Sequence, residues 1–522
     1  MTQQGTLALL VGGMSQRMGQ DKGLQPIHGL PIIIRQIKRW QPFFKEILII
    51  CSSEEQKEKY RSVLKAHRKD FLRVVVDESG PDRSAAYGLR AALKESQTEK
   101  VVVLPVDAAG IDRRIIEKLL VSKGLPAAYK DHKGMLYPFP SVWSKCHFSD
   151  FPADEGSLTQ QSIQKLLNYF SFSSLQPTSS EEKLLKVNLN TPQDVESYFG
   201  NPVQDSLGRH LSYLRLSLTE SCNMACQYCL PKGFPGWESA QFQMPFEGVC
   251  NILQAFRKLG FEKVRFTGGE PSLHPKLIAA IEEARSLGYE TISLTTNGSF
   301  IRNCSSLVEA GLTHINISLD TIHEQSFFKI TGNKHLSKVM ALIDQTLELG
   351  MNVKINTVVL RTQNYHEIPS LLEWAKWRPL TLRFIELMPT GLHHTYFKEN
   401  TVSNEEVQSL ALTLGYAPSS HLDSFEPAGP AVLYDHPKYS CRLGFISPLS
   451  CNFCNRCNRL RVTAQGKLRL CLFSEKDLAL PLQERPQVLS DIIRSLLIQK
   501  QESHFLTLGQ TGNMAHFRAV GG

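Results

Sequence analysis

Short apolar segments alternate with helix-compatible segments along most of the chain, which restricts the fold to the α/β class with mostly parallel strands. The first half has four such apolar segments, at 7–11, 46–51, 72–77 and 101–107. The second half has six, at 214–219, 264–269, 291–296, 315–320, 353–358 and 382–387, and each ends in polar or glycine residues. Six parallel strands joined by helices predict a partial or full barrel of the TIM type, with its chemistry at the carboxyl ends of the strands.

The length of 522 residues exceeds that of one compact domain, so at least two domains are expected. Phe199-Gly200-Asn201-Pro202 follows the last helix-compatible segment of the first half and combines residues that break regular structure. The boundary is therefore predicted here, with one domain at 1–199 and a second at 200–522.

Composition and charge exclude several classes of protein. With 42% hydrophobic and 21% charged residues, the chain is ordinary globular and neither disordered nor fibrous. No apolar run approaches the ~18 residues of a membrane span, and the first residues lack the basic start of a signal peptide. We therefore expect a cytoplasmic protein with no membrane partner.

The net charge of +8 is mild for a chain of this length. Without a Lys/Arg block, this charge favours pockets for phosphate-bearing small molecules over a nucleic-acid partner.

Seven of the twelve cysteines fall into two tight groups in the second half, which in a reducing compartment indicates metal or cluster binding. The first group, Cys222, Cys226 and Cys229, directly follows the first predicted strand of that half. Three thiolates at this spacing can hold three irons of a 4Fe-4S cluster and leave the fourth iron open. A structural zinc site with a distant fourth ligand is the alternative.

The first cysteine group resembles that of the radical S-adenosylmethionine superfamily, because Tyr228 precedes the third cysteine of a Cys-x3-Cys-x2-Cys motif. The segment Thr267-Gly268-Gly269-Glu270-Pro271 on the next strand resembles the glycine motif of that superfamily. The resemblance implies that S-adenosylmethionine binds at the open iron and is cleaved there to a hydrogen-abstracting radical. A glycine in this motif permits close approach of another group to the backbone.

The second cysteine group comprises Cys451, Cys454, Cys457 and Cys471. Its last three members form a Cys-x2-Cys-x13-Cys pattern that includes Arg459 and Arg461. Together with YLRLSLTESCNMACQYC, VRFTGGEPSL, LTTNG, INISLD, RFIELM and a final Gly-Gly, it resembles GTP 3',8-cyclases, which act in molybdenum cofactor biosynthesis. The likeness runs from about residue 205 to the C-terminus and implies a second 4Fe-4S cluster that binds the purine of GTP. Cys451 departs from the pattern: it is interpreted as a bystander, while a four-thiolate cluster or a zinc site remains the alternative.

The cyclase resemblance implies a role for individual residues. Those at GTP-contacting positions are Arg215, Arg265, Thr295, Lys354, Arg459 and Arg461. Those around S-adenosylmethionine are Tyr228, Gly269, Ser318 and Met388. The resemblance also implies that Gly521 and Gly522 reach into the active site and are catalytic, together with Arg215, Arg459 and Arg461. The implied product is (8S)-3',8-cyclo-7,8-dihydroguanosine 5'-triphosphate. A radical enzyme acting on RNA or a peptide is the alternative.

A glycine loop follows the first predicted strand and extends through Gly-Gly-x-Ser-x-Arg-Met-Gly-x-Asp-Lys to Lys22. Backbone N–H groups of such a loop bind phosphates. This string resembles the molybdenum cofactor guanylyltransferases, and implies a Rossmann-like nucleotidyltransferase domain that joins GMP from GTP to the molybdopterin cofactor. Implied GTP-binding residues are Leu10, Val11, Gly12, Lys22, Asp77 and Asp107, of which Lys22 and Asp107 are catalytic and Asp107 also binds Mg²⁺. Either Asp could instead cap a helix or a turn.

The N-terminal half also departs from that family. Residues 82–88 replace a short small-residue turn, Ala-Ala-Gly follows Asp107, and Cys51-Ser52-Ser53 lacks an Asn. A cytidylyltransferase or an inactive binding module is therefore the alternative for this half. The two resemblances together predict a bifunctional enzyme. The expected partners are GTP, the molybdopterin cofactor, a downstream cyclic pyranopterin monophosphate synthase, and an electron donor such as flavodoxin or ferredoxin.

Overall fold

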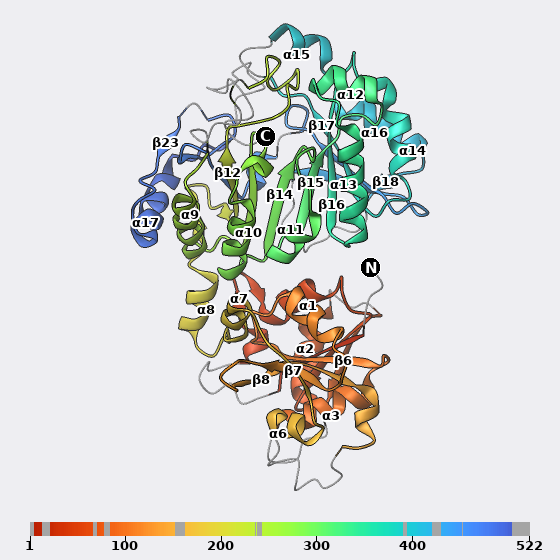
Figure 1. The fold of residues 1–522 in the computed structure, drawn as a ribbon, viewed down its shortest axis with the longest axis vertical. Helices are drawn as coiled ribbons and strands as arrows, with labels where there is room; N and C mark the ends of the chain where they lie inside the picture. Colours follow the sequence, from red (N-terminus) through yellow and green to blue (C-terminus); the bar gives the residue numbers. More distant parts are fainter. Residues whose placement is uncertain are drawn as a thin grey trace. The chain divides into compact units, whose positions relative to one another are not determined.

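The computed structural model describes residues 5–12, 21–65, 70–77, 84–151, 162–234, 236, 243–389, 394–419, 430–451, 453–474 and 476–503. The chain divides into two compact units, Met1–Tyr198 and Phe199–Gly522 (Figure 1). No helix in these residues is long and apolar enough to cross a membrane.

The first unit is built on a seven-stranded sheet with the order β5-β4-β1-β6-β8-β7-β9. Its four parallel strands are β1 (Thr6–Leu10), β4 (Glu46–Cys51), β5 (Leu72–Val76) and β6 (Lys100–Pro105). The remaining strands are β7 (Ala127–Lys130), β8 (Leu136–Ser144), which runs antiparallel to β6, and β9 (Ser173–Leu175). Every residue of β1 and β4 is buried, as expected of parallel strands covered on both faces.

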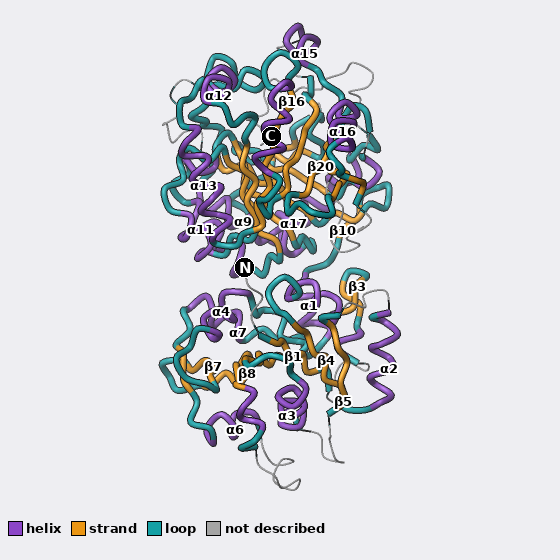
Figure 2. Tube along the Cα trace, turned by 90° about the vertical axis from the view of Figure 1, so that its right-hand side faces the viewer, coloured by secondary structure: helices purple, strands orange, loops and turns teal. Residues whose placement is uncertain are grey.

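Helices cover both faces of this sheet, with α1 and α4 on one side and α3 and α6 on the other (Figure 2). The helices are α1 (Ile32–Trp40), α2 (Glu54–Val63), α3 (Ala85–Glu95), α4 (Arg113–Leu120), α6 (Ile163–Tyr169), α7 (Ser179–Leu185) and α8 (Pro192–Phe199). Short 3-10 turns are Lys22–Leu24 and Lys145–Phe148, and β2 (Pro26–Ile27) pairs with β3 (Leu30–Pro31). The predicted Rossmann-like architecture is confirmed. Since the strand order reverses direction at β1, ligands are expected at the carboxyl ends of β1 and β6.

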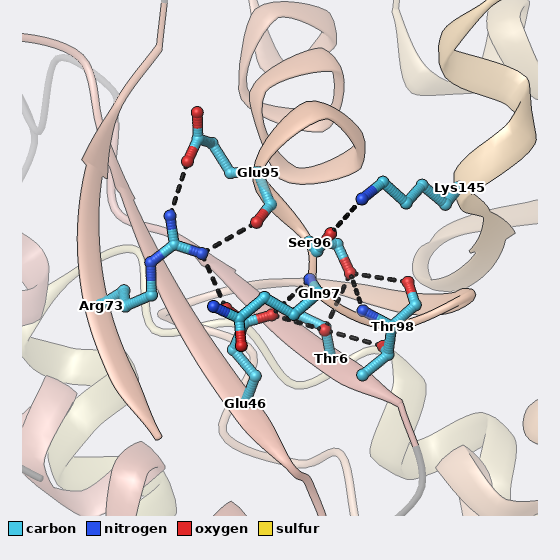
Figure 3. Close-up of polar contacts among 8 residues, drawn as sticks. All are labelled: Thr6, Glu46, Arg73, Glu95, Ser96, Gln97, Thr98 and Lys145. Carbon is cyan, nitrogen blue, oxygen red and sulfur yellow. Dashed lines mark hydrogen bonds and ion pairs between the residues drawn. The ribbon is translucent and has the colours of Figure 1, made fainter. Parts of the chain in front are cut away.

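A network of polar contacts fastens the opposite, amino ends of these strands (Figure 3). The buried Glu46 accepts hydrogen bonds from Thr6 Oγ1 at 2.8 Å, Arg73 Nη1 at 2.9 Å and the Gln97 N–H at 3.0 Å. Arg73 also pairs with Glu95 at the end of α3, at 2.6 Å. Because a buried carboxylate needs several donors, this network joins β1, β4, β5 and the end of α3 into one rigid edge.

The second unit is built on a twelve-stranded sheet, in the order β18-β19-β20-β17-β16-β15-β14-β13-β12-β21-β22-β23. Its central parallel strands are β12 (Tyr213–Thr219), β13 (Lys263–Gly268), β14 (Thr291–Thr296), β15 (His314–Ser318), β16 (Asn352–Val359) and β17 (Thr381–Glu386). β20 (Arg442–Ile446) extends this parallel set beside β17, and β21 (Arg459–Val462) extends it beside β12. In the described residues β20 and β21 do not pair with each other, so the barrel is open. The predicted partial barrel is confirmed.

Helices and short antiparallel strands complete the second unit, and α10, α11 and α13 cover the outer face of the sheet (Figure 1). The helices are α9 (Phe246–Lys258), α10 (Leu277–Ser286), α11 (Cys304–Ala310), α12 (Glu324–Thr331), α13 (Leu336–Glu348), α14 (Ile368–Ala375), α15 (His394–Asn400), α16 (Asn404–Thr413) and α17 (Pro486–Leu496). The short strands are β10 (Val203–Gln204), β11 (His210–Leu211), β18 (Ala417–Pro418), β19 (Ala431–Asp435), β22 (Lys467–Arg469) and β23 (Leu478–Ala479). The 3-10 turns are Pro271–Leu273, Tyr365–Glu367, Cys454–Arg456 and Leu497–Gln499.

The segment that starts the second unit packs against the C-terminal end of α9. Arg257 Nη1 donates to the carbonyl of Phe199 at 3.1 Å, and the Asn201 N–H donates to the carbonyl of Lys258 at 2.9 Å. Gly200 has φ +73°, and a Cβ there would lie 2.2 Å from the Arg257 carbonyl oxygen. The glycine is therefore required by both backbone conformation and close packing, and the segment is part of the second unit's fold.

Candidate active sites

The first cysteine group lies in the loop that follows the carboxyl end of β12. Cys222, Cys226 and Cys229 are all partly buried, and none of them forms a disulfide. The loop is held by hydrogen bonds from the Ala225 N–H to the carbonyl of Thr331 at 2.8 Å and from the Gln227 N–H to the carbonyl of Ile330 at 3.0 Å. The end of α12 thus fixes the backbone between the cysteines.

The three thiols of this group are close enough to influence one another. Burial raises the pKa of Cys226 well above its usual value, and the neighbouring Cys222, Asp320 and Cys229 raise it further. Such a concentration of thiols and negative charge needs a cation to become fully deprotonated, which iron supplies. The residues of the first group therefore fit a 4Fe-4S cluster with three protein ligands.

Tyr228, within the cysteine loop, is held by Asp320 at the end of β15. Its hydroxyl donates to Asp320 Oδ2 at 2.8 Å, and the Val358 N–H donates to Asp320 Oδ1 at 2.8 Å. Burial raises the pKa of Asp320 to about 6, although both hydrogen bonds act in the opposite direction. The sequence analysis named Tyr228 but no role for Asp320, whose only signal was its position at a strand end.

The glycine motif packs on the backbone that leads into Cys222. A Cβ on Gly269 would lie 2.3 Å from the carbonyl oxygen of Ser221, and the Gly269 N–H donates to the carbonyl of Thr219 at 2.8 Å. Glu270, also buried, accepts from Thr296 Oγ1 at 2.7 Å and from the Asn297 N–H at 2.6 Å. The motif therefore joins β12, β13 and β14 at their carboxyl ends, and the lack of a side chain at Gly269 serves this packing.

The second cysteine group lies at the other end of the same strands. Cys454 and Cys457 precede the amino end of β21, and Cys471 follows β22, which pairs antiparallel with β21. None of these three forms a disulfide and all three are partly buried, whereas Cys451 is exposed. Burial would raise the pKa of Cys457, but Lys500 and Arg459 outweigh it and lower that pKa below its usual value. A set of partly buried thiols next to cations fits a second cluster.

In the described part of the chain, no three His, Cys, Asp or Glu side chains converge closely enough to hold a single metal ion. The segment that follows Cys471 approaches the first group, because Leu472 and Phe473 belong to the same apolar cluster as Cys229 and Met388.

Between the two cysteine groups, three arginines lie side by side on neighbouring strands. Arg215 of β12 is in register with Arg461 of β21 and with Arg265 of β13. All three are buried, with 8%, 7% and 9% exposure respectively. Burial and the adjacent Arg461 lower the pKa of Arg215, while burial and Arg459 lower the pKa of Arg461 to about 10. This concentration of positive charge fits a polyanionic ligand.

Tyr213 lies one inward position before Arg215 and is surrounded by the same cations. Burial alone would raise its pKa, but Arg265, Lys263, Arg215 and Arg459 lower it to about 8. Its hydroxyl has no hydrogen-bond partner among the described residues. The sequence analysis did not identify this tyrosine, because nothing in its local sequence indicates that four cations surround it.

Further polar side chains line the inside of the barrel. Thr295 and Lys354 are in register with Asn316 from either side, and Arg383 Nη2 donates to Asn316 Oδ1 at 2.5 Å. Buried oxygens without a hydrogen-bond partner in the described structure are Ser217 Oγ, Ser293 Oγ, Thr295 Oγ1 and Asn356 Oδ1. Since buried polar atoms are normally satisfied, these oxygens fit a site for a polar ligand. Arg383 and Asn316 were missed by the sequence analysis, although polar residues inside otherwise apolar strands were the available signal.

The structure corrects one expectation about where the chemistry lies. The first cysteine group, Ser318 and Met388 are at or after the carboxyl ends of their strands. The second group lies at the amino end of β21, and the arginines lie within the strands. The cause is β21, which runs parallel to β12 and is preceded by its cysteines instead of being followed by them. Gly521 and Gly522 lie outside the described residues.

In the first unit, Lys22 and Asp107 meet beyond the carboxyl ends of β1 and β6. Lys22 Nζ forms an ion pair with Asp107 Oδ2 at 2.7 Å and donates to Asn190 Oδ1 at 2.8 Å. Leu10 is the last residue of β1, and Val11 and Gly12 follow it; the Val106 N–H donates to the carbonyl of Leu10 at 3.0 Å. A cation and a carboxylate at the strand-order reversal fit a phosphate and metal site.

Asp21, next to Lys22, is fixed by α2. Tyr60 Oη donates to Asp21 Oδ1 at 2.6 Å, and Gln56 Nε2 donates to Asp21 Oδ2 at 2.6 Å and to the carbonyl of Val11 at 3.0 Å. Asp77 follows β5, where its N–H donates to the carbonyl of Cys51 at 2.8 Å, two strands away from β1. Residues 13–20 of the glycine loop and 78–83 lie outside the described residues. The described part of the loop is therefore held in place independently of any nucleotide.

Three family models match separate stretches of the chain. The MobA-like NTP transferase domain matches residues 7–174, the Radical SAM superfamily 216–375, and Molybdenum Cofactor Synthesis C 380–506. The GTP 3',8-cyclase of Shewanella denitrificans is 40% identical over 332 residues, which cover 61% of this chain and 96% of that protein. The chain belongs to the GTP 3',8-cyclase family.

Other members of the cyclase family match the same part of the chain. The GTP 3',8-cyclase of Vibrio vulnificus is 39% identical over 329 residues, covering 61% of this chain and 97% of its own length. Solved structures include molybdopterin-guanine dinucleotide biosynthesis protein A from Archaeoglobus fulgidus (20% identity, TM-score 0.30, 37% of this chain and 95% of that one). Another is Streptococcus suis SuiB bound to S-adenosylmethionine, with 15% identity and a TM-score of 0.42; the match covers 67% of this chain and 84% of that one. By the residues that the family models match, the Radical SAM and Molybdenum Cofactor Synthesis C models lie in the second unit and the transferase model lies in the first.

Proposed function

We propose that the protein is a bifunctional enzyme of molybdenum cofactor biosynthesis, and that its second unit converts GTP to (8S)-3',8-cyclo-7,8-dihydroguanosine 5'-triphosphate. The observation that carries this proposal is the row formed by Arg461, Arg215 and Arg265 inside the barrel, between two cysteine groups. A nucleoside triphosphate brings about four negative charges, which offset the cost of burying these guanidinium groups. Family membership supports the same substrate.

Different residues of the barrel would hold the two clusters, S-adenosylmethionine and GTP. Cys222, Cys226 and Cys229 would hold one 4Fe-4S cluster, with S-adenosylmethionine placed by Tyr228, Gly269, Ser318 and Met388. When bound, the cluster and S-adenosylmethionine supply the radical that abstracts hydrogen from the substrate. Cys454, Cys457 and Cys471 would hold the second cluster at the purine end. Arg215, Arg265, Arg459, Arg461, Thr295 and Lys354 bind and orient GTP, joined by Gly521 and Gly522, while the apolar cluster around Cys229 and Met388 excludes water from the space between the cysteine groups.

The test compares GTP binding and turnover for Arg461→Met and the exposed control Arg302→Met. A hydrogen bond to a charged group contributes about 1.5–3 kcal/mol, so the Kd for GTP should rise roughly ten- to hundredfold in Arg461→Met and stay constant in the control. Unchanged GTP binding in Arg461→Met would overturn the assignment of the arginine row. Turnover of an RNA or peptide in place of GTP would favour the alternative radical enzyme.

For the first unit we propose transfer of GMP from GTP to the molybdopterin cofactor, with Mg²⁺ bound at Asp107. The contact that supports it is the Lys22–Asp107 ion pair, held by Asn190 beside the glycine loop. A metal ion at Asp107 would free Lys22 for the triphosphate, where it stabilises charge as pyrophosphate leaves. Leu10, Val11 and Gly12 would lie along the phosphates, and Asp77 would contact GTP.

Guanylyl transfer should be lost in Lys22→Ala and Asp107→Asn, while Lys59→Ala on the exposed face of α2 leaves it unchanged. Cyclisation of GTP should persist in all three variants, because the second unit has its own site. Transfer from CTP in preference to GTP would show a cytidylyltransferase, and full transfer activity in both site variants would refute the site.

We further propose that a cyclic pyranopterin monophosphate synthase takes the cyclised product and that flavodoxin or ferredoxin supplies electrons.

A further inference from the structure

A buried lysine lies directly behind the second cysteine group. Lys500 follows the 3-10 turn Leu497–Gln499, is 4% exposed, and donates from Nζ to the carbonyl of Leu470, the residue before Cys471. The ammonium group of Lys500 interacts electrostatically with the thiols of Cys457 and Cys471. Burial of an ammonium group is costly unless negative charge faces it. In the neighbourhood of Lys500 that charge comes from the thiolates and from Asp205.

Arg209 holds the other side of the same cysteine group. Its Nε pairs with the buried Asp205 Oδ2 at 2.6 Å, and its Nη1 donates to the carbonyl of Cys454 at 2.8 Å. The same guanidinium donates to the carbonyls of Glu502 at 2.9 Å and Gln501 at 2.7 Å. The planar guanidinium group of Arg209 therefore connects the turn at Cys454 to the chain segment that follows Lys500.

The two side chains thus brace both parts of the cysteine group from one place. Lys500 acts on Cys471 through Leu470, and Arg209 acts on Cys454, while residues 500–502 connect the two. Asp205 fixes Arg209 and is itself fixed, because its Oδ1 accepts from the backbone N–H groups of Leu207 and Arg209, both at 3.0 Å.

We propose that Asp205, Arg209 and Lys500 are positioning residues for the second 4Fe-4S cluster, and that the ammonium group of Lys500 stabilises its more negative, reduced state. This inference rests on the proposed cyclase function, which requires a cluster at Cys454, Cys457 and Cys471. A nearby fixed positive charge favours the state that carries the extra electron, so removing it should lower the midpoint potential of the cluster.

The test uses the full chain with Cys222, Cys226 and Cys229 replaced by Ser, so that only the second cluster is present. Lys500→Met, Lys500→Arg and the exposed control Lys476→Met are reconstituted anaerobically. Iron per chain and the midpoint potential, followed by electron paramagnetic resonance, are the readouts. Lys500→Met should bind clearly less than about four irons or show a lower potential. Lys500→Arg should keep most of both properties, and Lys476→Met should match the parent. Equal iron and equal potential in Lys500→Met would overturn the role of Lys500.

Arg209→Lys keeps a charge but cannot reach three carbonyls, and it tests the brace even where Lys500→Met fails to fold. Hydrogen exchange at the amides of Cys454–Arg456 should become faster in this variant, and unchanged exchange would refute the brace. Failure of the proposed function has a different signature, because the parent itself would then bind no iron at the second group.

Discussion

At the scale of single residues, the barrel of the second unit keeps several guanidinium groups out of water before any substrate arrives. Arg215, Arg265 and Arg461 are each less than one-tenth exposed, and neighbouring strands hold them in register. Their mutual repulsion and desolvation raise the free energy of the empty site, and a bound triphosphate relieves both. The pKa of Tyr213 depends on this positive charge, because the phenol lies next to the arginines.

Tyr213 should lose its proton near pH 8, well below the ordinary tyrosine pKa of about 10. Because its folded-state pKa is the lower one, its contribution to stability grows as the pH rises from 8 toward 10 and is lost as the pH falls through 8. Carbon NMR of labelled tyrosine in the cluster-free protein measures this midpoint, and Tyr213→Phe assigns the signal. GTP should raise the midpoint by cancelling the arginine charge. A midpoint near 10 without GTP would contradict the prediction.

Gly269→Ala should prevent assembly of the first cluster while leaving the second intact. The new Cβ would lie 2.3 Å from the carbonyl oxygen of Ser221, so the backbone that leads into Cys222 must move, at a cost of about 1–3 kcal/mol. Iron should fall from about eight to about four per chain. Gly124→Ala is the control, because its Cβ would meet nothing closer than 3.4 Å. Iron that stays at the parental level in Gly269→Ala would show that the loop adapts.

At the scale of elements, the predicted strands are found because each is a short apolar run bounded by polar residues. The sequence did not reveal that β20 and β21 extend the barrel, since these strands are short and carry Arg442, Arg459 and Arg461. It therefore could not show that the second cysteine group lies at the amino end of the strands. Contacts such as those of Arg209 and Lys500 depend on chain segments far apart in sequence, which local patterns do not reveal.

The segment that opens the second unit gives a matched test at this scale. Gly200 and Gly208 have nearly equal φ angles, +73° and +75°, but only Gly200 is packed against α9. Both alanine variants should lose about 1–2 kcal/mol for the left-handed conformation. Gly200→Ala should lose about 1–3 kcal/mol more from overpacking. Hydrogen exchange of the Asn201 and Leu259 amides measures the difference, and equal exchange in the two variants would contradict it.

At the scale of the whole molecule, each unit has its own hydrophobic core, so each is expected to fold as an independent domain. The core of the first unit includes Ala8, Leu48, Leu89, Val103 and Trp143, and that of the second includes Leu216, Phe256, Phe266, Phe384 and Leu460. The two activities proposed here therefore need no shared residues. Base choice and pterin docking in the first unit stay predictions, because residues 13–20 and 78–83 lie outside the described structure.

Removing iron should destabilise only the second unit. Ligands that bind the folded state alone raise its stability by mass action, and the cysteine groups belong entirely to Phe199–Gly522. Calorimetry of the protein before and after anaerobic chelation should show one transition shifted to lower temperature and one unchanged. A shift of equal size in both transitions would show that the units unfold together.

The pairing of β21 with β12 has a consequence for how the protein is made. The sheet of the first unit is complete once translation has passed Leu175, whereas Arg209 must wait for Cys454, 245 residues later. At about 5–20 residues per second, the transferase half leaves the ribosome tens of seconds before the chain ends. During that time β12 is an open edge of a growing barrel. The last hairpin closes that edge and gathers the second set of thiols in one event, so iron delivery to them belongs after release of the finished chain.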